Sequence, residues 1–250
     1  MITRKSKREI EKMKEAGDIL VKCHKEIAKM IKPGITTMEI NALAEKIMEE
    51  HGATPEQKGY NGYEYATCAS INDEICHGFP RDEKLKDGDI VTVDMVVNKD
   101  GGLADSAWTY AVGNVDEKGH RLMEVTKTAL YKGIEQAQAG NRIGDIGHAI
   151  QTYAEGEGFS VVRDFTGHGI GPTLHEDPHI PHFGLPNKGL RLKEGMVITI
   201  EPMINEGSWH SKMDANNWTA RTTDKGRSAQ YEHTIVITKE GPMILTDQDN

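Results

Sequence analysis

Five side chains that can ligate a metal ion stand within or beside stretches of the sequence that are otherwise apolar. They are Asp94, Asp105, His168, Glu201 and Glu232. Three of the acids, Asp94, Glu201 and Glu232, stand at the ends of runs rich in valine and isoleucine. An ionised carboxylate that is buried without a partner costs so much free energy that the group normally becomes neutral instead. No lysine or arginine accompanies these acids on their runs, so a shared pair of divalent cations is the simplest counter-charge.

Two of the acids belong to a predicted β-hairpin. A strand near 90–97, a turn at Asn98-Lys99-Asp100-Gly101-Gly102 and a return strand over 103–112 follow from the apolar runs and the turn residues between them. Because side chains alternate along a strand and pair across the ladder, Asp94 and Asp105 can face the same side of the sheet. Two carboxylates so close repel each other unless a cation lies between them.

The histidine of this set lies in the segment Thr166-Gly167-His168-Gly169-Ile170-Gly171. Glycines on both sides let the backbone come close to its surroundings and aim the imidazole into a site. Four carboxylates and one imidazole form an oxygen-rich ligand set, which suits Mn²⁺, Fe²⁺, Co²⁺ or Zn²⁺ in a two-metal centre. Ligand softness does not choose among these ions. His175 and His77 are further candidates for the same pocket.

A competing metal motif is present and is excluded by one residue. Residues 175–179 read His-Glu-Asp-Pro-His and match the H-E-x-x-H signature of zinc proteases. That signature needs both histidines on one face of a helix, and Pro178 prevents a helix because it clashes with the preceding turn and restricts Asp177. His175 remains a candidate for the pocket, whereas His179 and His182 are assigned to packing or to the surface.

Helices are predicted on either side of the hairpin. Ser6 and Glu9 form a capping box that begins a helix ending before Lys32-Pro33-Gly34, and a second helix begins at Thr36 or Thr37 and stops at Gly52. Two more helices are predicted from about 116 to 137 and from about 143 to 155.

The chain repeats itself at an offset of about 106 residues. The segment 34–40 resembles 140–146, and the segment 86–94, which ends in Asp94, resembles 193–201, which ends in Glu201. We therefore predict two related halves, about 1–113 and 114–250, within one domain that spans 1–250. Helices grouped with hairpins predict an α+β fold, in which helices cover one face of a curved, mainly antiparallel sheet.

The amino-acid composition restricts where the protein can be located in the cell and which kinds of partner it can bind. The chain has 250 residues and a net charge of −9, with no dense basic block, which argues against nucleic acid as a partner. No run approaches the ~20 apolar residues that cross a bilayer, and no apolar segment follows the basic N-terminus as in a signal peptide. Three cysteines without a C-x-x-C pair favour a reducing compartment. We therefore expect a cytoplasmic protein without a membrane partner.

Six motifs together make the family recognisable. They are Asn72-Asp73-Glu74-Ile75-Cys76-His77-Gly78, Asp94 with Asp105, Thr166-Gly167-His168-Gly169-Ile170-Gly171, His175-Glu176, Ile200-Glu201-Pro202-Met203 and Ala229-Gln230-Tyr231-Glu232-His233-Thr234. On these residues the sequence resembles the methionine aminopeptidases, specifically the short bacterial type I form with the pita-bread fold. The likeness extends over almost the whole chain.

The resemblance implies removal of the initiator methionine from nascent polypeptides when the second residue is small. It implies a hydroxide activated between two divalent metal ions, with Asp105 and Glu232 bridging them, His168 and Glu201 completing one and Asp94 the other. Glu201 would also transfer the proton of the attacking water. His175 would hydrogen-bond the carbonyl oxygen and His77 would contact the scissile nitrogen. A monomer that acts close to the ribosome is expected.

The resemblance also implies a pocket for the methionine side chain. Its walls would be Tyr60, Tyr63, Cys68, Leu174 and Trp218, together with His77 and His175. Aromatic and sulfur-bearing walls suit a thioether. Leu174 stands where many relatives carry phenylalanine, and Val96 stands where relatives often have a hydroxyl side chain near the substrate amine.

Two other functions are known for proteins with this fold. An Xaa-Pro aminopeptidase of the same fold usually carries an additional N-terminal domain, for which 250 residues leave no room. A non-catalytic pita-bread adaptor typically loses metal ligands, whereas all five are present here.

Overall fold

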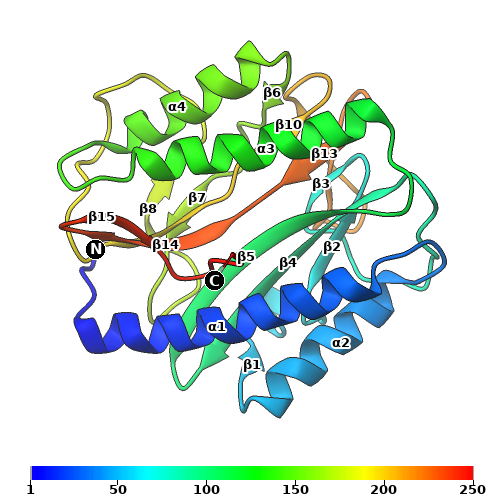
Figure 1. Ribbon diagram of the computed structural model, residues 1–250, viewed down its shortest axis with the longest axis horizontal. Coiled ribbons are helices and arrows are strands. Elements are labelled where there is room, and N and C mark those ends of the chain that lie inside the picture. The colour runs from blue at the N-terminus through cyan, green and yellow to red at the C-terminus, as the bar shows by residue number, and fades with distance from the viewer. Residues whose placement is uncertain (1, 250) are drawn as a thin grey trace.

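The computed structural model describes residues 2–249 (Figure 1). Its helices are α1 (Lys7–Met30), α2 (Thr37–Glu50), α3 (Glu117–Glu135), α4 (Ile143–Gly156) and the short 3-10 helix η1 (Tyr60–Gly62). Its strands are β1 (Thr54–Pro55), β2 (Cys68–Ile71), β3 (Glu74–Cys76), β4 (Ile90–Lys99), β5 (Gly102–Ala111), β6 (Ser160–Val161), β7 (Gly167–Gly169), β8 (Glu176–Ile180), β9 (Val197–Ile200), β10 (Met203–Asn205), β11 (Ser211–Met213), β12 (Ala220–Thr222), β13 (Ser228–Gln230), β14 (His233–Thr238) and β15 (Gly241–Ile244).

The helices begin where their capping residues predict. Ser6 forms a capping box with Glu9 at the start of α1, and Thr36 forms one with Glu39 at the start of α2. In each box the hydroxyl accepts from the backbone N–H of the glutamate, whose carboxylate accepts in return from the backbone N–H of the cap. The bounds of α1, α2, α3 and α4 confirm the four predicted helices, with ends that differ by a few residues at most.

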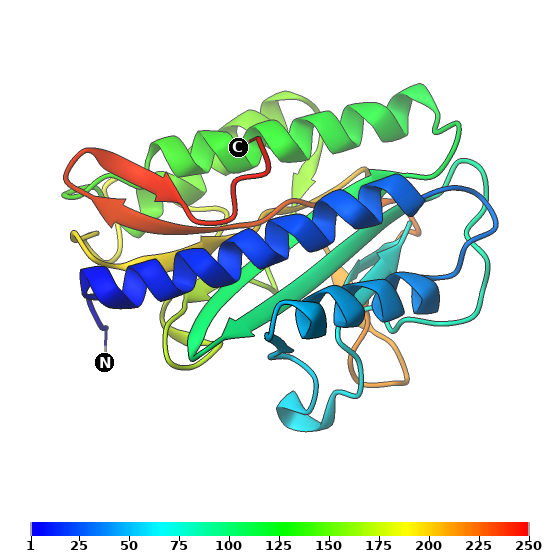
Figure 2. The same ribbon diagram turned by 60° about the horizontal axis from the view of Figure 1, so that its bottom comes forward.

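In the first half of the chain, α1 and α2 cover one face of the long β4–β5 hairpin. Alternate residues of β4, among them Val91 and Val93, are fully buried in a core cluster with Leu20 of α1 and Ile40 of α2. Figure 2 shows α1 lying across the hairpin. The residues between them, including Asp94, therefore face away from these helices.

The second half repeats this arrangement with other elements. β14 lies between β9 and β15, and β9 also pairs with β7. Ile198 of β9 and Ile235 of β14 are buried in a cluster with Leu130 of α3 and Ile146 of α4. The alternate positions, such as Thr199, face the other way, toward the first half.

Hydroxyl side chains join β5 of the first half to β13 and β14 of the second. Thr234 Oγ1 accepts from Asp105 N at 2.9 Å and donates to Asp105 O at 2.7 Å, and Ser106 Oγ donates to Glu232 O at 3.0 Å. Glu232 N also donates to Ala107 O at 2.9 Å. These bonds place Asp105 and Glu232 side by side.

The predicted α+β architecture is confirmed. The strand pairings described over residues 2–249 are all antiparallel. The pair α1–α2 and the pair α3–α4 lie on opposite sides of the join between the halves (Figure 1). The boundary of the halves near residue 113 and the single-domain extent stay predictions. No helix within residues 2–249 combines the length and the apolar character that crossing a bilayer requires.

Candidate active site

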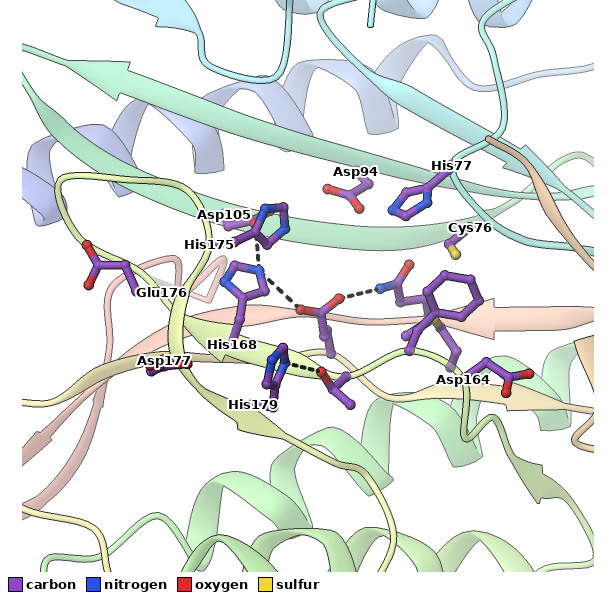
Figure 3. Close-up of a pocket in the computed structure, with 15 residues that line it drawn as sticks. Cys76, His77, Asp94, Asp105, Asp164, His168, His175, Glu176, Asp177 and His179 are labelled. Carbon is purple, nitrogen blue, oxygen red and sulfur yellow. Dashed lines mark hydrogen bonds and ion pairs between the residues drawn. The ribbon is translucent and has the colours of Figure 1, made fainter. Parts of the chain in front are cut away.

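The predicted metal ligands converge where the two halves meet. Ligand atoms of Asp105, His168 and Glu232 all lie within 4.8 Å of one another. His168 Nε2 lies 3.5 Å from Asp105 Oδ2 and 3.5 Å from Glu201 Oε1. Asp94 faces the same cavity, as Figure 3 shows. The structure therefore brings all five candidates together, although they come from distant parts of the chain.

The hairpin delivers its two acids as the strand period predicts. Asp94 pairs across the ladder with Ala107, and Asp105 pairs with Val96, two residues farther along β4. Asp94 and Asp105 are therefore diagonal neighbours on one face. Met95, the residue after Asp94, faces the helices instead and belongs to the core cluster of α1 and α2.

The backbone around His168 fixes which ring nitrogen is available. Its Nδ1 lies 2.9 Å from the backbone oxygen of Gly169, and its backbone N–H donates to Thr199 Oγ1 at 3.0 Å. A proton on Nδ1 that donates to this carbonyl leaves the lone pair of Nε2 free for a cation. The flanking glycines are required, since a Cβ at Gly167 would lie 2.4 Å from Thr199 O and one at Gly169 would lie 2.2 Å from Asp177 O.

The electrostatics of this cluster call for a cation. Burial and then the neighbouring carboxylates raise the pKa of Asp94 and of Glu232 well above the usual range. Burial is also the main cause that raises the pKa of Glu201, to about 7. Burial alone would lower the pKa of His168, but its contact with Asp105 and the charge of Glu201 raise it to about 9.

Several ligand atoms of the cluster have no hydrogen-bond partner among residues 2–249. Asp105 Oδ1 and both carboxylate oxygens of Glu232 are buried and accept no hydrogen bond. Buried polar atoms are almost always satisfied, so orphaned carboxylate oxygens indicate a missing electrostatic partner. Oxygen atoms and one imidazole nitrogen fit a divalent ion such as Mn²⁺, Fe²⁺, Co²⁺ or Zn²⁺. The donor set present therefore fits the predicted metal centre.

Three side chains that hold Glu201 were not predicted. Thr199 Oγ1 donates to Glu201 Oε1 at 2.8 Å, and Gln230 Nε2 lies 3.3 Å from Glu201 Oε2. The backbone N–H of Glu201 donates to Nε2 of His182, which is fully buried. Burial lowers the pKa of His182 to about 3, which keeps its ring neutral and able to accept this bond. Gln230 lies in a quoted motif, but no sequence pattern links His182 to Glu201.

Two connected cavities surround the cluster. The larger, of about 550 Å³, contains Asp94, Asp105, His168 and Glu201 among its walls. The smaller, of about 160 Å³, is lined by Gln57, Tyr60, Tyr63, Cys68, His77, Asp94, Val96, Asp105, Leu174, His175 and Trp218. All seven residues predicted for the methionine pocket line this smaller cavity. Gln57, which donates to Cys68 Sγ at 3.6 Å, was not predicted.

His77 and His175 line both cavities. His175 Nδ1 lies 3.0 Å from Tyr60 Oη, and its ring centre lies 4.4 Å from that of His168. His77 has a left-handed backbone, with φ of 57°, and its carbonyl accepts from Thr219 Oγ1 at 3.1 Å. Burial lowers the pKa of His77, and burial followed by the charge of His168 lowers the pKa of His175 to about 4. Both rings are therefore neutral near pH 7.

The exclusion of a helical zinc-protease motif is confirmed. Residues 176–180 form strand β8 and not a helix, with a cis peptide bond between Asp177 and Pro178. His179 points toward the larger cavity, where its Nδ1 lies 3.3 Å from Thr166 Oγ1. His179 is exposed, as its assignment to packing or surface expects, and β8 pairs it directly with His168 at the wall of this cavity.

Comparisons with known proteins agree with this geometry. Residues 11–239 match the model of metallopeptidase family M24. The chain is 52% identical to methionine aminopeptidase 1 of Bacillus subtilis (strain 168) over 246 residues, which cover 98% of this chain and 99% of that protein. The crystal structure of methionine aminopeptidase from Rickettsia prowazekii superposes with a TM-score of 0.97 at 44% identity, covering 99% of this chain and 100% of that one.

A proline-specific enzyme of the same fold is more distant. The prolidase from Pyrococcus furiosus has a TM-score of 0.80 at 26% identity, and the alignment covers 98% of this chain but only 65% of that one. The unmatched third agrees with the expectation that proline-directed relatives carry additional chain. The proline-directed alternative is therefore not favoured. From its fold, its ligand cluster and these likenesses, the chain belongs to metallopeptidase family M24 and, within it, to the methionine aminopeptidases.

Proposed function

We propose that this enzyme removes the initiator methionine from nascent polypeptides whose second residue is small. One observation carries the proposal: the carboxylate-rich cavity opens directly into the small aromatic cavity. His77, Asp94, Asp105 and His175 line both. A methionine side chain in the smaller cavity would place its free α-amino group beside Asp94 and Asp105, and its peptide carbonyl among the ligands. An N-terminal residue alone meets both requirements.

Two divalent ions are proposed as the cofactor, with Asp105 and Glu232 shared between them. His168 and Glu201 would complete one site and Asp94 the other. When bound, the ions lower the pKa of a water molecule toward neutrality and polarise the scissile carbonyl. The unpaired oxygens of Asp105 and Glu232 support this assignment.

Glu201 is the proposed proton carrier. It lines the larger cavity, and its two oxygens are oriented by Thr199 and Gln230. A carboxylate with a pKa raised toward neutral pH can accept a proton from the attacking water and pass it to the leaving nitrogen. The hydrogen bond from its backbone to His182 holds the end of β9 in place for this transfer.

The two neutral histidines are proposed to bind the reacting peptide bond. Tyr60 can donate its hydroxyl proton to Nδ1 of His175, which leaves the proton of the ring on Nε2. That N–H can donate to the carbonyl oxygen as it gains negative charge. His77, at the junction of the cavities, would contact the scissile nitrogen.

The side-chain pocket supports selection of methionine. Tyr63 and Trp218 pack with ring centres 5.0 Å apart, and Cys68 and Leu174 complete buried walls. Thioether–aromatic contacts stabilise a methionine in such surroundings. A cytoplasmic location, action near the ribosome and a monomeric state complete the proposal, and they rest on the sequence arguments above.

One assay tests the proposal against its alternatives. Metal-loaded protein is incubated separately with the peptides Met-Ala-Ser, Met-Lys-Ser and Ala-Pro-Ser, and released amino acids are measured. Methionine released from Met-Ala-Ser alone is expected. Cleavage of Ala-Pro-Ser alone would assign a proline-directed peptidase, and no cleavage with Mn²⁺, Fe²⁺, Co²⁺ or Zn²⁺ would leave the adaptor. Metal analysis of protein purified without added metal identifies the ions and their number.

A further inference from the structure

The N-terminal segment, residues 2–6, is hydrogen-bonded to the turn that precedes β9 and packs against the core. The backbone N–H of Lys5 donates to Gly195 O at 2.7 Å, and Arg4 Nε donates to Glu194 O at 2.5 Å. Ile2 packs against the core cluster of α3 and α4. The segment is therefore fixed to the turn that precedes β9.

From this segment the side chain of Lys5 passes inward to the half-buried carboxylate of Glu176. Lys5 Nζ lies 2.8 Å from Glu176 Oε2, with side-chain exposures of 4% and 14% respectively. Thr3 Oγ1 lies 3.3 Å from the same oxygen. Burial would raise the pKa of Glu176, but the contact with Lys5 outweighs it and lowers that pKa. The two residues thus form an ion pair that is shielded from water.

The second oxygen of Glu176 holds the loop that precedes β8. Glu176 Oε1 lies 3.3 Å from Thr173 N and 3.4 Å from Thr173 Oγ1, which in turn lies 3.4 Å from His175 O. Figure 3 shows the carboxylate of Glu176 pointing away from His168 and His175. One carboxylate therefore joins the N-terminal segment to the loop whose last two residues are Leu174 and His175.

Gly171 gives independent evidence that this contact shapes the loop. A Cβ at Gly171 would lie 2.5 Å from Lys5 Cε, 2.7 Å from Lys5 Nζ and 2.8 Å from Glu176 Oε1. A residue with a side chain would displace the lysine or the loop. The last glycine of the His168 motif thus leaves room for the ion pair, and the atoms closest to it belong to Lys5 and Glu176 and not to the metal ligands.

We propose that Lys5 is a positioning residue for His175. Its ion pair with Glu176 holds the 171–176 loop so that His175 keeps its 3.0 Å contact with Tyr60 and its place beside His168. The inference rests on the proposed function, in which His175 binds the carbonyl oxygen. Lys5 lines neither of the two active-site cavities, so it acts through Glu176 and the loop.

The first test compares Lys5→Met with a matched control. Lys14→Met makes the same change in α1, where Lys14 pairs with Asp18 and both side chains are exposed by 45% and 63%. A misplaced catalytic group costs one to two orders of magnitude in rate. We therefore expect Lys5→Met to lower kcat for methionine release from Met-Ala-Ser by about tenfold or more, with KM changed less than about twofold. Lys14→Met should change neither. An unchanged kcat in Lys5→Met would overturn the inference.

A double-mutant cycle distinguishes positioning from general stability. If Lys5 acts through His175, Lys5→Met should change kcat less than about twofold in a His175→Ala background. If Lys5 only stabilises the fold, the loss should be the same in both backgrounds. Equal losses would overturn the inference.

Two further measurements test the inference if Lys5→Met does not fold or if the protein lacks the proposed activity. Should Lys5→Met not fold, Lys5→Met/Glu176→Gln removes both charges at similar volume, a change that buried pairs often tolerate, and its kcat is judged by the same criterion. A crystal structure of the folded variant should show His175 Nδ1 separated from Tyr60 Oη by more than a hydrogen bond. If the variant keeps this contact, the inference is wrong. The contact can be measured even if the wild type releases no methionine, and that lack of release would by itself refute only the proposed function.

Discussion

Removing the divalent ions should make the stability of this enzyme fall steeply with pH. The pKa of Glu201 is about 7 when no cation is bound, against an ordinary value of 4.5. Between these two values the folded protein keeps a proton that the unfolded chain has released. Because the folded state then binds more protons, the free energy of unfolding decreases as pH rises from about 4.5 to about 7.

The size of the effect follows from the two values. They differ by about 2.5, and each pKa unit corresponds to about 1.4 kcal/mol, so Glu201 alone should lower the free energy of unfolding by about 3 kcal/mol. His168 has a pKa of about 9 in place of 6.5, and it extends the decline from about pH 6.5 to 9. Asp94 and Glu232, whose pKa values are also raised, act in the same direction.

Urea unfolding of EDTA-treated protein at several pH values between 4.5 and 9 measures this decline, with Mn²⁺-loaded protein as the comparison. Bound ions replace the protons, so the loaded protein should show a much smaller slope and a higher overall stability. Glu201→Gln in the metal-free protein should make the slope between about pH 4.5 and 7 shallower, because Asp94 and Glu232 keep their own contributions. A free energy of unfolding that is flat over this range without metal, or that falls equally with it, would refute the reasoning.

Four substitutions test the roles assigned to single residues. Glu201→Ala should lower methionine release by about 10²-fold or more, since it removes the proton carrier, while circular dichroism shows an intact fold; retained turnover would exclude Glu201 from the mechanism. His175→Ala should lower kcat by about 10²- to 10³-fold with a smaller change in KM, as loss of an oxyanion donor does, and steady-state kinetics that show only a KM effect would contradict this role. The buried carboxylate of Glu74 pairs with Arg81 at 2.7 Å and with Arg221 at 3.1 Å. Arg221→Met should destabilise the fold by about 1.5 kcal/mol in urea, because it removes one of the two charged partners; an unchanged midpoint would show that Arg81 alone suffices. Leu174→Ala should raise KM for Met-Ala-Ser by enlarging the side-chain cavity, and an equal KM would show that Leu174 does not contact methionine.

Local features of this protein could be predicted from the sequence. The capping boxes at Ser6 and Thr36, the β4–β5 hairpin and the shared face of Asp94 and Asp105 all depend on residues a few positions apart or on the period of a strand. Pro178 excluded a helix for the same local reason. The sequence likewise predicted that these carboxylates bind metal ions, because carboxylates beside apolar runs need a counter-charge in any fold that buries them.

The family resemblance supplied what local patterns could not. Spacing alone does not bring Glu232 beside Asp105, and the pocket residues Tyr60, Cys68 and Trp218 share no period. They were expected from the family resemblance, and the structure gathers them around one cavity. Their roles in binding substrate remain for the assays above.

Only the tertiary structure decided how the halves meet and what holds the reacting groups in place. Thr234 and Ser106 join β5 to the segment that carries Glu232, His182 lies behind Glu201, and Lys5 reaches Glu176 across most of the chain. A hydroxyl, a neutral imidazole or a lysine at such positions leaves no periodic pattern in the sequence. Which partner each one finds depends on the packing of distant elements, because a hydrogen bond or ion pair forms only when folding brings both atoms within about 3 Å.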